Sequence, residues 1–203
     1  MELIVFQIAI LIFSVVVHEV SHGAVAQALG DPTAKNAGRL TLNPIPHIDP
    51  LGSVIFPLLL FITTQGQFMF GWAKPVPINP FNFRDRKWGA LKVGLAGPAA
   101  NIAMALAFAL VLRFLPFELY PSSAFPLLLS YVVMLNILLG VFNLLPIPPL
   151  DGSHVLFTFL PRAFDSFKIM LTQYGFIILV FVIFFFSEVI SDIVRSVFLL
   201  LVG

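Results

Sequence analysis

The apolar stretch at residues 3–22, LIVFQIAILIFSVVVHEVSH, decides the fold class of this chain. Residues 3–17 hold no charged side chain, and the helical pattern continues as far as Gly30, where Asp31-Pro32 supplies a stop signal. About 20 predominantly apolar residues in a helix are enough to cross the hydrocarbon core of a bilayer. The stretch therefore predicts a transmembrane helix that carries ionisable side chains towards its C-terminal end.

The composition of the whole chain agrees with a protein that has the lipid bilayer as its surroundings. Of the 203 residues, 59% are hydrophobic and 10% are charged, whereas globular proteins carry about 25% charged residues. So few charges exclude a soluble monomer, because they cannot cover a folded surface of this size. The net charge of +1 gives no signal for nucleic acid as a partner, and the absence of cysteine excludes disulfides, thiolate metal sites and cysteine nucleophiles.

Charge-free runs predict the remaining helices. One lies at residues 93–112, a second lies between Glu118 and Asp151, and a third lies between Lys168 and Glu188. Residues 188–203 form either a short final span or an interfacial amphipathic helix. The expected fold is an all-α membrane protein, a polytopic bundle of about four to six transmembrane helices.

The chain is expected to form a single integral-membrane domain over residues 1–203, with its core at about 1–160 and C-terminal helices at about 165–203. Two segments of the core depart from simple spans. Leu51–Thr64 is strongly apolar but short and contains a proline, so a spanning and a re-entrant interpretation both stay open. Arg39–Asn43 alternates polar and apolar residues, which predicts a short β-strand or hairpin.

The sharpest chemical feature is His18-Glu19-Val20-Ser21-His22, an H-E-x-x-H motif on the first helix. Histidines at i and i+4 project from one helix face and can share a cation, while Glu19 is placed to accept a proton from water. The competing interpretation is a histidine pair that satisfies a polar patch in a helix bundle. Ionisable groups inside an apolar span cost on the order of 3 kcal/mol each unless they are paired or coordinated, which favours the metal site.

A catalytic zinc ion takes three protein ligands, so the two histidines leave one ligand to find. The candidate is Asp151, because it ends the longest charge-free interval of the chain. Its alternative role is the N-cap of the helix that follows. Asn143, two turns earlier, is a candidate to donate a hydrogen bond to a developing oxyanion. Its alternative role is to cap the carbonyl groups that Pro146 leaves free.

Together these motifs resemble the site-2 protease family of intramembrane zinc metalloproteases, peptidase family M50. The resemblance rests on the H-E-x-x-H helix, on Asn143–Gly152 with its Leu-Asp-Gly, and on AGPAAN at residues 96–101. The loops GRLTLNP at residues 38–44 and GWAKPVP at residues 71–77 are similar to the compact prokaryotic branch, which carries no PDZ or CBS domain. The likeness covers residues 10–155 well and the tail weakly.

The resemblance implies one Zn²⁺ per chain bound by His18, His22 and Asp151. It also implies Glu19 as general base and Asn143 near the scissile carbonyl. The implied activity is that of a metalloendopeptidase that hydrolyses a peptide bond in or next to a transmembrane helix of a membrane-protein substrate, as in regulated intramembrane proteolysis. The alternative is a metal-binding or metal-transporting membrane protein without hydrolytic activity, which needs no unliganded carboxylate beside its histidines.

The metal hypothesis also predicts the topology. Both ligand groups lie towards the C-terminal ends of their spans, so those two spans should run in the same direction. A re-entrant Leu51–Thr64 leaves two crossings between them and keeps the ligands at one face of the membrane. Residues 65–92 hold five basic residues against one acidic residue, which marks this face as cytoplasmic. We therefore expect a prokaryotic inner-membrane protein with its active site towards the cytoplasm.

His47 is the remaining candidate. It lies in His47-Ile48-Asp49-Pro50, just before the apolar segment whose path is open. The sequence leaves two roles for it: a supporting or regulatory part at the metal site, or the organisation of the turn.

Overall fold

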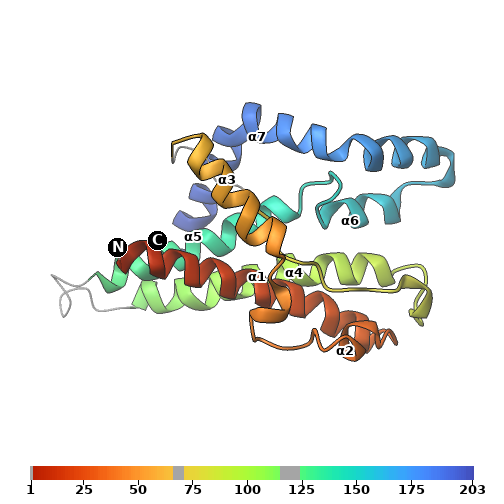
Figure 1. Cartoon of the computed structure of the whole chain (residues 1–203), viewed down its shortest axis with the longest axis horizontal. Coiled ribbons are helices and arrows are strands. Elements are labelled where there is room, and N and C mark those ends of the chain that lie inside the picture. Colours follow the sequence, from red (N-terminus) through yellow and green to blue (C-terminus); the bar gives the residue numbers. More distant parts are fainter. Residues whose placement is uncertain (1, 66–70, 115–123) are drawn as a thin grey trace.

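The computed structural model describes residues 2–65, 71–114 and 124–203, which are built mainly from helices (Figure 1). The long helices are α1 (Glu2–Ala28), α4 (Gly89–Phe114), α5 (Phe125–Asn143) and α7 (Asp165–Val202). The shorter ones are α2 (Thr33–Asn36), η1 (Ile45–His47), η2 (Pro50–Ile55), α3 (Phe56–Thr63), η3 (Pro80–Asn82), α6 (Gly152–Phe159) and η5 (Arg162–Phe164). The four long helices are apolar enough to cross a membrane, as expected for a multi-pass membrane protein.

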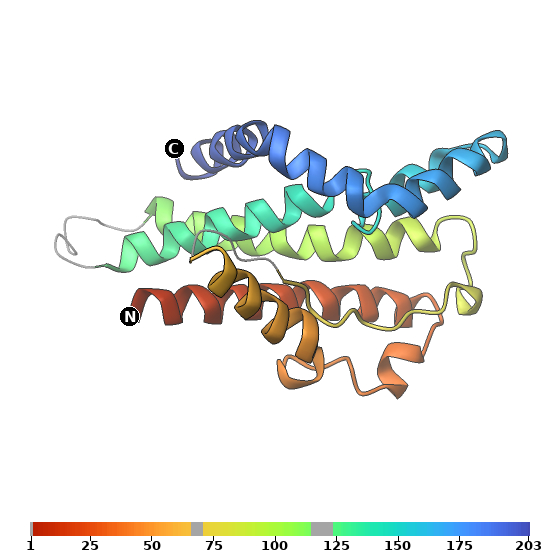
Figure 2. The same ribbon diagram turned by 45° about the horizontal axis from the view of Figure 1, so that its top comes forward.

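The directions of the long helices decide which loops meet. Helices α1 and α5 run one way, and α4 and α7 run the other way (Figures 1 and 2). The C-terminal ends of α1 and α5 therefore lie at the same end of the bundle as the N-terminal ends of α4 and α7. This arrangement agrees with the expectation that the histidine helix and the helix before Asp151 run in parallel.

The C-terminal tail is part of α7 rather than a separate helix, which corrects the division at Glu188. A helix of 38 residues is about 57 Å long, and Figure 1 shows its axis changing direction before the C-terminus. Glu188 and Asp192 are exposed, so they do not interrupt the helix. The opposite side of this part packs into a core made by three helices, with Ala105 and Ala109 from α4, Val133 and Ile137 from α5, and Ile190 and Val194 from α7.

The apolar segment before the site leaves the bundle and comes back to the same place. Pro50–Thr63 is a short apolar helical stretch, formed by η2 and α3, and no residue of α3 is buried. After α3 the chain returns, and the amide of Trp72 donates to the carbonyl of Gly52 at 3.0 Å. Because its start and its return lie side by side, the segment does not carry the chain to the other end of the bundle.

The predicted strand at Arg39–Asn43 is wrong, because the backbone bends there and no strand occurs anywhere in the described ranges. Its polar groups bond locally instead. The amide of Asn43 donates to Oγ1 of Thr41, and the amide of Ile45 donates to Oδ1 of Asn43, both at 3.1 Å. Thr and Asn side chains that capture nearby amides favour turns over a ladder of paired strands.

Asp31 ties the end of α1 to the loop before α4. Helix α1 ends as predicted, with Gly30 in the left-handed region at φ +106°. The two carboxylate oxygens of Asp31 accept hydrogen bonds from Thr33, from the amide of Asn79 and from the side chain of Asn82. Burial opposes ionisation, but these donors outweigh it and hold the pKa of Asp31 below its usual value.

Candidate functional site

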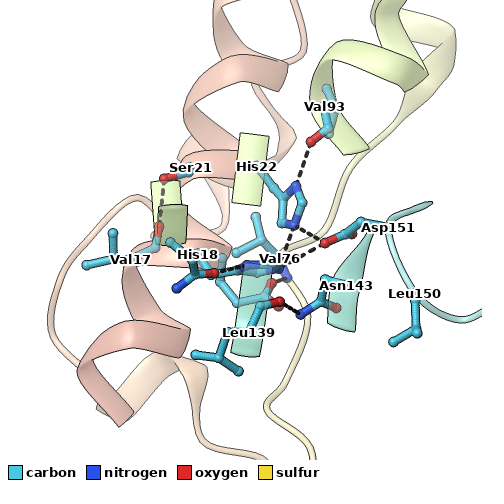
Figure 3. A network of polar contacts seen from close by, with 12 residues as sticks. Val17, His18, Ser21, His22, Val76, Val93, Leu139, Asn143, Leu150 and Asp151 are labelled. Atoms are coloured by element: carbon cyan, nitrogen blue, oxygen red, sulfur yellow. Dashed lines mark hydrogen bonds and ion pairs between the residues drawn. The ribbon is translucent and has the colours of Figure 1, made fainter. Parts of the chain in front are cut away.

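Three ligand-type side chains converge between the C-terminal half of α1 and the loop that follows α5 (Figure 3). His18 and His22 project from one face of α1, and Asp151 lies just before α6. Oδ2 of Asp151 lies 3.0 Å from Nε2 of His18 and 3.2 Å from Nε2 of His22, and the two Nε2 atoms are 3.0 Å apart. Asp151 occupies the N-cap position of α6, but its side chain makes no capping hydrogen bond.

The other nitrogen of each imidazole fixes which atoms face the cluster. Nδ1 of His22 donates to the carbonyl of Val93 at 2.7 Å. Nδ1 of His18 lies 2.6 Å from Oδ1 of Asn101, whose Nδ2 donates to other acceptors, so Oδ1 is the acceptor and Nδ1 carries the hydrogen. When each ring is neutral, as a metal-binding imidazole must be, its Nε2 therefore presents a lone pair to the cluster.

This set of atoms fits a bound cation. Two imidazole lone pairs meet a carboxylate oxygen, and Oδ2 of Asp151 accepts no hydrogen bond from any donor in the described part of the chain. The two histidines are 7% and 6% exposed, so bulk water screens these atoms only weakly from one another. Lone pairs repel at such distances unless a positive charge lies between them. Two His nitrogens and one carboxylate oxygen are the ligand types of catalytic zinc sites, which keep a fourth position open.

Gly97 on α4 makes the space in front of the histidines. A Cβ at this position would lie 2.5 Å from Cε1 and 2.6 Å from Nε2 of His18, and closer still to Nε2 of His22. Glycine thus lets the backbone of α4 approach the atoms that would hold a metal. Gly94, one turn earlier, allows a similar approach, because its Cβ would lie 3.1 Å from the carbonyl of Asp151.

Glu19 points into the same cavity, and a proline-rich strap, defined as residues 74–77, holds it there. The amide of Val76 donates to Oε2 of Glu19 at 2.8 Å. The buried guanidinium of Arg39 holds the strap from the other side and donates to the carbonyls of Lys74 and Pro75 at 2.6 and 3.4 Å. The carboxylate of Glu19 is therefore anchored by a backbone group and is not one of the three clustered ligand-type side chains.

The cavity beside the cluster has a volume of about 280 Å³, and Asn143 and His154 line it together with Glu19 and the strap. Asn143 lies at the end of α5, and its Nδ2 donates to the carbonyl of Leu139 at 2.9 Å. This bond is within its own helix, so the amide group is available to turn towards the cavity at the cost of one hydrogen bond.

His47 lies outside the group formed by His18, His22 and Asp151. It is 2% exposed, and its Nε2 lies 3.0 Å from the carbonyl of Thr41. Its own carbonyl accepts the amide of Lys74 at 2.9 Å. The geometry places His47 in the turn and next to the base of the strap.

Sequence reasoning missed three contributors to the site. Asn101 stood in the motif AGPAAN without a role, and only its contact with His18 assigns one. Gly97 of the same motif gave no signal beyond its small size. Val76 acts through its backbone amide, so its side chain gives no signal at all.

Comparison with known proteins gives consistent matches. The profile of peptidase family M50 matches residues 120–182. The chain is 36% identical over 183 residues to "Putative zinc metalloprotease YwhC" of Bacillus subtilis, which covers 88% of this chain and 80% of that protein. It is 31% identical over 169 residues to "Putative zinc metalloprotease Rip2" of Mycolicibacterium smegmatis, which covers 83% of this chain and 62% of that protein. Among solved structures there is no significant match.

Proposed function

The chain belongs to peptidase family M50, the site-2 protease family, and from this membership we propose that it is an intramembrane zinc metalloprotease. Its substrate would be a membrane protein, cleaved in or next to a transmembrane helix, as in regulated intramembrane proteolysis. The relatives named as zinc metalloproteases support the chemistry. The long apolar helices that carry the cluster support a site within the membrane.

One observation favours a hydrolytic enzyme over a protein that only binds or transports metal. Next to the three clustered ligand-type atoms, Glu19 lines the same cavity and is held by the amide of Val76. A carboxylate that is anchored beside a metal site without entering it is the group that a hydrolytic enzyme of the H-E-x-x-H type needs. A transport site gains nothing from it.

The proposed roles follow from the positions of the side chains. His18, His22 and Asp151 would hold one zinc ion, which when bound supplies Lewis acidity that activates water and polarises a carbonyl group. Glu19 would accept the proton of the attacking water and return it to the leaving amine. Asn143 would turn its Nδ2 from the carbonyl of Leu139 to the oxyanion that develops on the substrate.

We also propose that Pro50–Thr63 is re-entrant and that the active site faces the cytoplasm of a prokaryotic cell. The hydrogen bond between Trp72 and Gly52 supports re-entry, because it joins the two ends of the segment. The loop before α4, which carries basic residues, lies at the end of the bundle where α1 ends, and His18 and His22 lie in the C-terminal half of α1, which supports the cytoplasmic side. Cysteine labelling from both sides of the membrane at Leu40 and at Lys74 tests this topology, since re-entry requires these two positions, which flank the segment, to report the same face.

A substrate helix must unwind before it can react. Its scissile carbonyl is bonded inside the helix, and in a bilayer no water replaces that bond. The cavity must therefore admit an extended stretch of chain as well as water.

Reconstitution in vesicles with a single-span membrane-protein substrate tests the function. The wild type is compared with Glu19→Gln, with chelator treatment, and with Glu188→Gln as a matched control, because Glu188 is exposed on α7. Removing the general base should lower cleavage by roughly 10²- to 10⁴-fold while the zinc content is retained. Glu188→Gln should cleave like the wild type. Equal cleavage by all samples would defeat the protease, and zinc flux that survives Glu19→Gln would favour transport.

A further inference from the structure

A buried polar chain runs from the middle of the bundle to the candidate zinc site, through Asn136, Asn101 and Ser14. Both asparagines are 0% exposed and Ser14 is 1% exposed. They come from three helices, since Ser14 lies on α1, Asn101 on α4 and Asn136 on α5. We propose that this chain positions His18 for zinc, by fixing both the orientation of its ring and the nitrogen that carries the hydrogen. The inference rests on the proposed zinc site.

The hydrogen bonds of this polar chain fix one another in order, from Asn136 through Asn101 to His18. Nδ2 of Asn136 donates to Oγ of Ser14 at 3.0 Å and to the carbonyl of Val132 at 2.9 Å, which turns its Oδ1 towards Asn101. Nδ2 of Asn101 donates to that Oδ1 at 2.9 Å and to the carbonyl of Ser14 at 3.3 Å. Its own Oδ1 is thereby left to accept Nδ1–H of His18 at 2.6 Å.

The amide hydrogens of both asparagines are used, so neither side chain can flip without losing bonds. The orientation of Asn136 therefore decides that of Asn101, and Asn101 decides that Nε2 of His18 has its lone pair free. A metal-binding histidine whose other nitrogen donates to a fixed acceptor is held in the ligating tautomer. His22 has a backbone acceptor for this purpose, whereas His18 depends on a side chain that itself must be fixed.

A purely structural role is the competing explanation, because polar side chains also hold transmembrane helices together. The two roles give opposite orders for two variants. Asn101→Asp keeps an oxygen that can accept from His18 but places a carboxylate in a fully buried position. Asn101→Leu is apolar and suits the buried position but offers His18 no acceptor. A positioning role predicts that zinc binds more tightly to Asn101→Asp than to Asn101→Leu. A purely structural role predicts the opposite order, because the apolar side chain disturbs the buried position less.

The test is metal binding by the full chain in detergent, without any substrate. Zinc affinity is measured by competition with a chromophoric chelator, and the geometry is followed by the visible absorption of bound Co²⁺. Asn101→Leu is expected to weaken zinc binding by about 10- to 100-fold and to change the Co²⁺ spectrum. Asn101→Asp should bind zinc more tightly than Asn101→Leu. Ser14→Ala should weaken binding by less than Asn101→Leu, because the serine acts through two further bonds.

Ser130→Ala is the matched control, since Ser130 donates to the carbonyl of Pro126 on α5 and takes no part in the chain. It should bind zinc like the wild type. Wild-type zinc affinity in Asn101→Leu, or affinity in Asn101→Leu equal to or above that in Asn101→Asp, overturns the inference. If Asn101→Leu does not fold, equal affinity in Ser14→Ala and Ser130→Ala overturns it. A wild-type protein that binds no zinc would remove the proposed function as well.

Discussion

Gly97→Ala is expected to weaken zinc binding while the helical bundle stays folded. The added Cβ would lie 2.5 Å from Cε1 and 2.6 Å from Nε2 of His18, and closer still to Nε2 of His22. Carbon atoms in ordinary contact are about 3.5–4.0 Å apart, so the overlap with both rings is roughly 1 Å. A zinc ion lies about 2.0–2.1 Å from a histidine nitrogen. The methyl group would thus occupy the space that the metal needs.

The histidine rings cannot yield at low cost, because each is held at Nδ1. Turning His18 breaks its bond to Asn101, and turning His22 breaks its bond to the carbonyl of Val93. Overpacking of a filled interior costs about 1–3 kcal/mol. Since a tenfold change in affinity corresponds to about 1.4 kcal/mol, zinc affinity is expected to fall roughly 5- to 150-fold.

The assay measures the zinc dissociation constants of the wild type and Gly97→Ala in detergent, together with the thermal unfolding of both proteins in excess chelator. Gly140→Ala is the control, because its Cβ would press on Cδ1 of Ile102 at 2.7 Å, the flexible end of a side chain that neither lines the cavity nor belongs to the ligand cluster. It should change stability without changing zinc affinity. Wild-type zinc affinity in folded Gly97→Ala protein would refute the position assigned to the metal.

Three further predictions concern the surroundings of the site. Val76→Pro removes the amide that anchors Glu19. Because a hydrogen bond to a charged group contributes about 1.5–3 kcal/mol, cleavage should fall roughly 10- to 100-fold while zinc affinity is unchanged. Val76→Ala keeps the amide and should cleave normally. Arg39→Ala frees the carbonyls of Lys74 and Pro75, so hydrogen exchange at the Val76 amide should become faster; unchanged exchange would show that the guanidinium does not hold the strap. Asp31 has a lowered pKa, so its contribution to stability is present above about pH 4 and is lost as the pH falls through the lower folded-state pKa. The melting temperatures of the wild type and Asp31→Asn should therefore converge on acidification, and a constant difference between pH 7 and pH 3 would contradict the assignment.

The parts of the site that could be predicted are those in which side-chain type and spacing carry the chemistry. His18 and His22 share a helix face at any helical i, i+4 spacing, and Asp151 stands out because charge is scarce around it. The structure brings these three residues together because two crossings, α4 and α5, return the chain to the same end.

The errors arose where one pattern fits two local structures. Alternation at Arg39–Asn43 suits a half-buried strand, but Thr41 and Asn43 use their side chains to bond nearby amides, which bends the backbone. The charges at Glu188 and Asp192 marked the end of an apolar run without marking the end of a helix, because both side chains point outward from α7.

Val76 has a consequence for how such a site can change over evolutionary time. Within Pro75-Val76-Pro77 only the central residue has an N–H group, and Glu19 receives it. The contact places no demand on the side chain, so nineteen of the twenty amino acids satisfy it and proline alone does not. A comparison of sequences would therefore reflect the packing of this buried side chain and not its hydrogen bond to Glu19. The position of the general base therefore depends on the backbone conformation of this loop, and a search for invariant side chains would not detect that dependence.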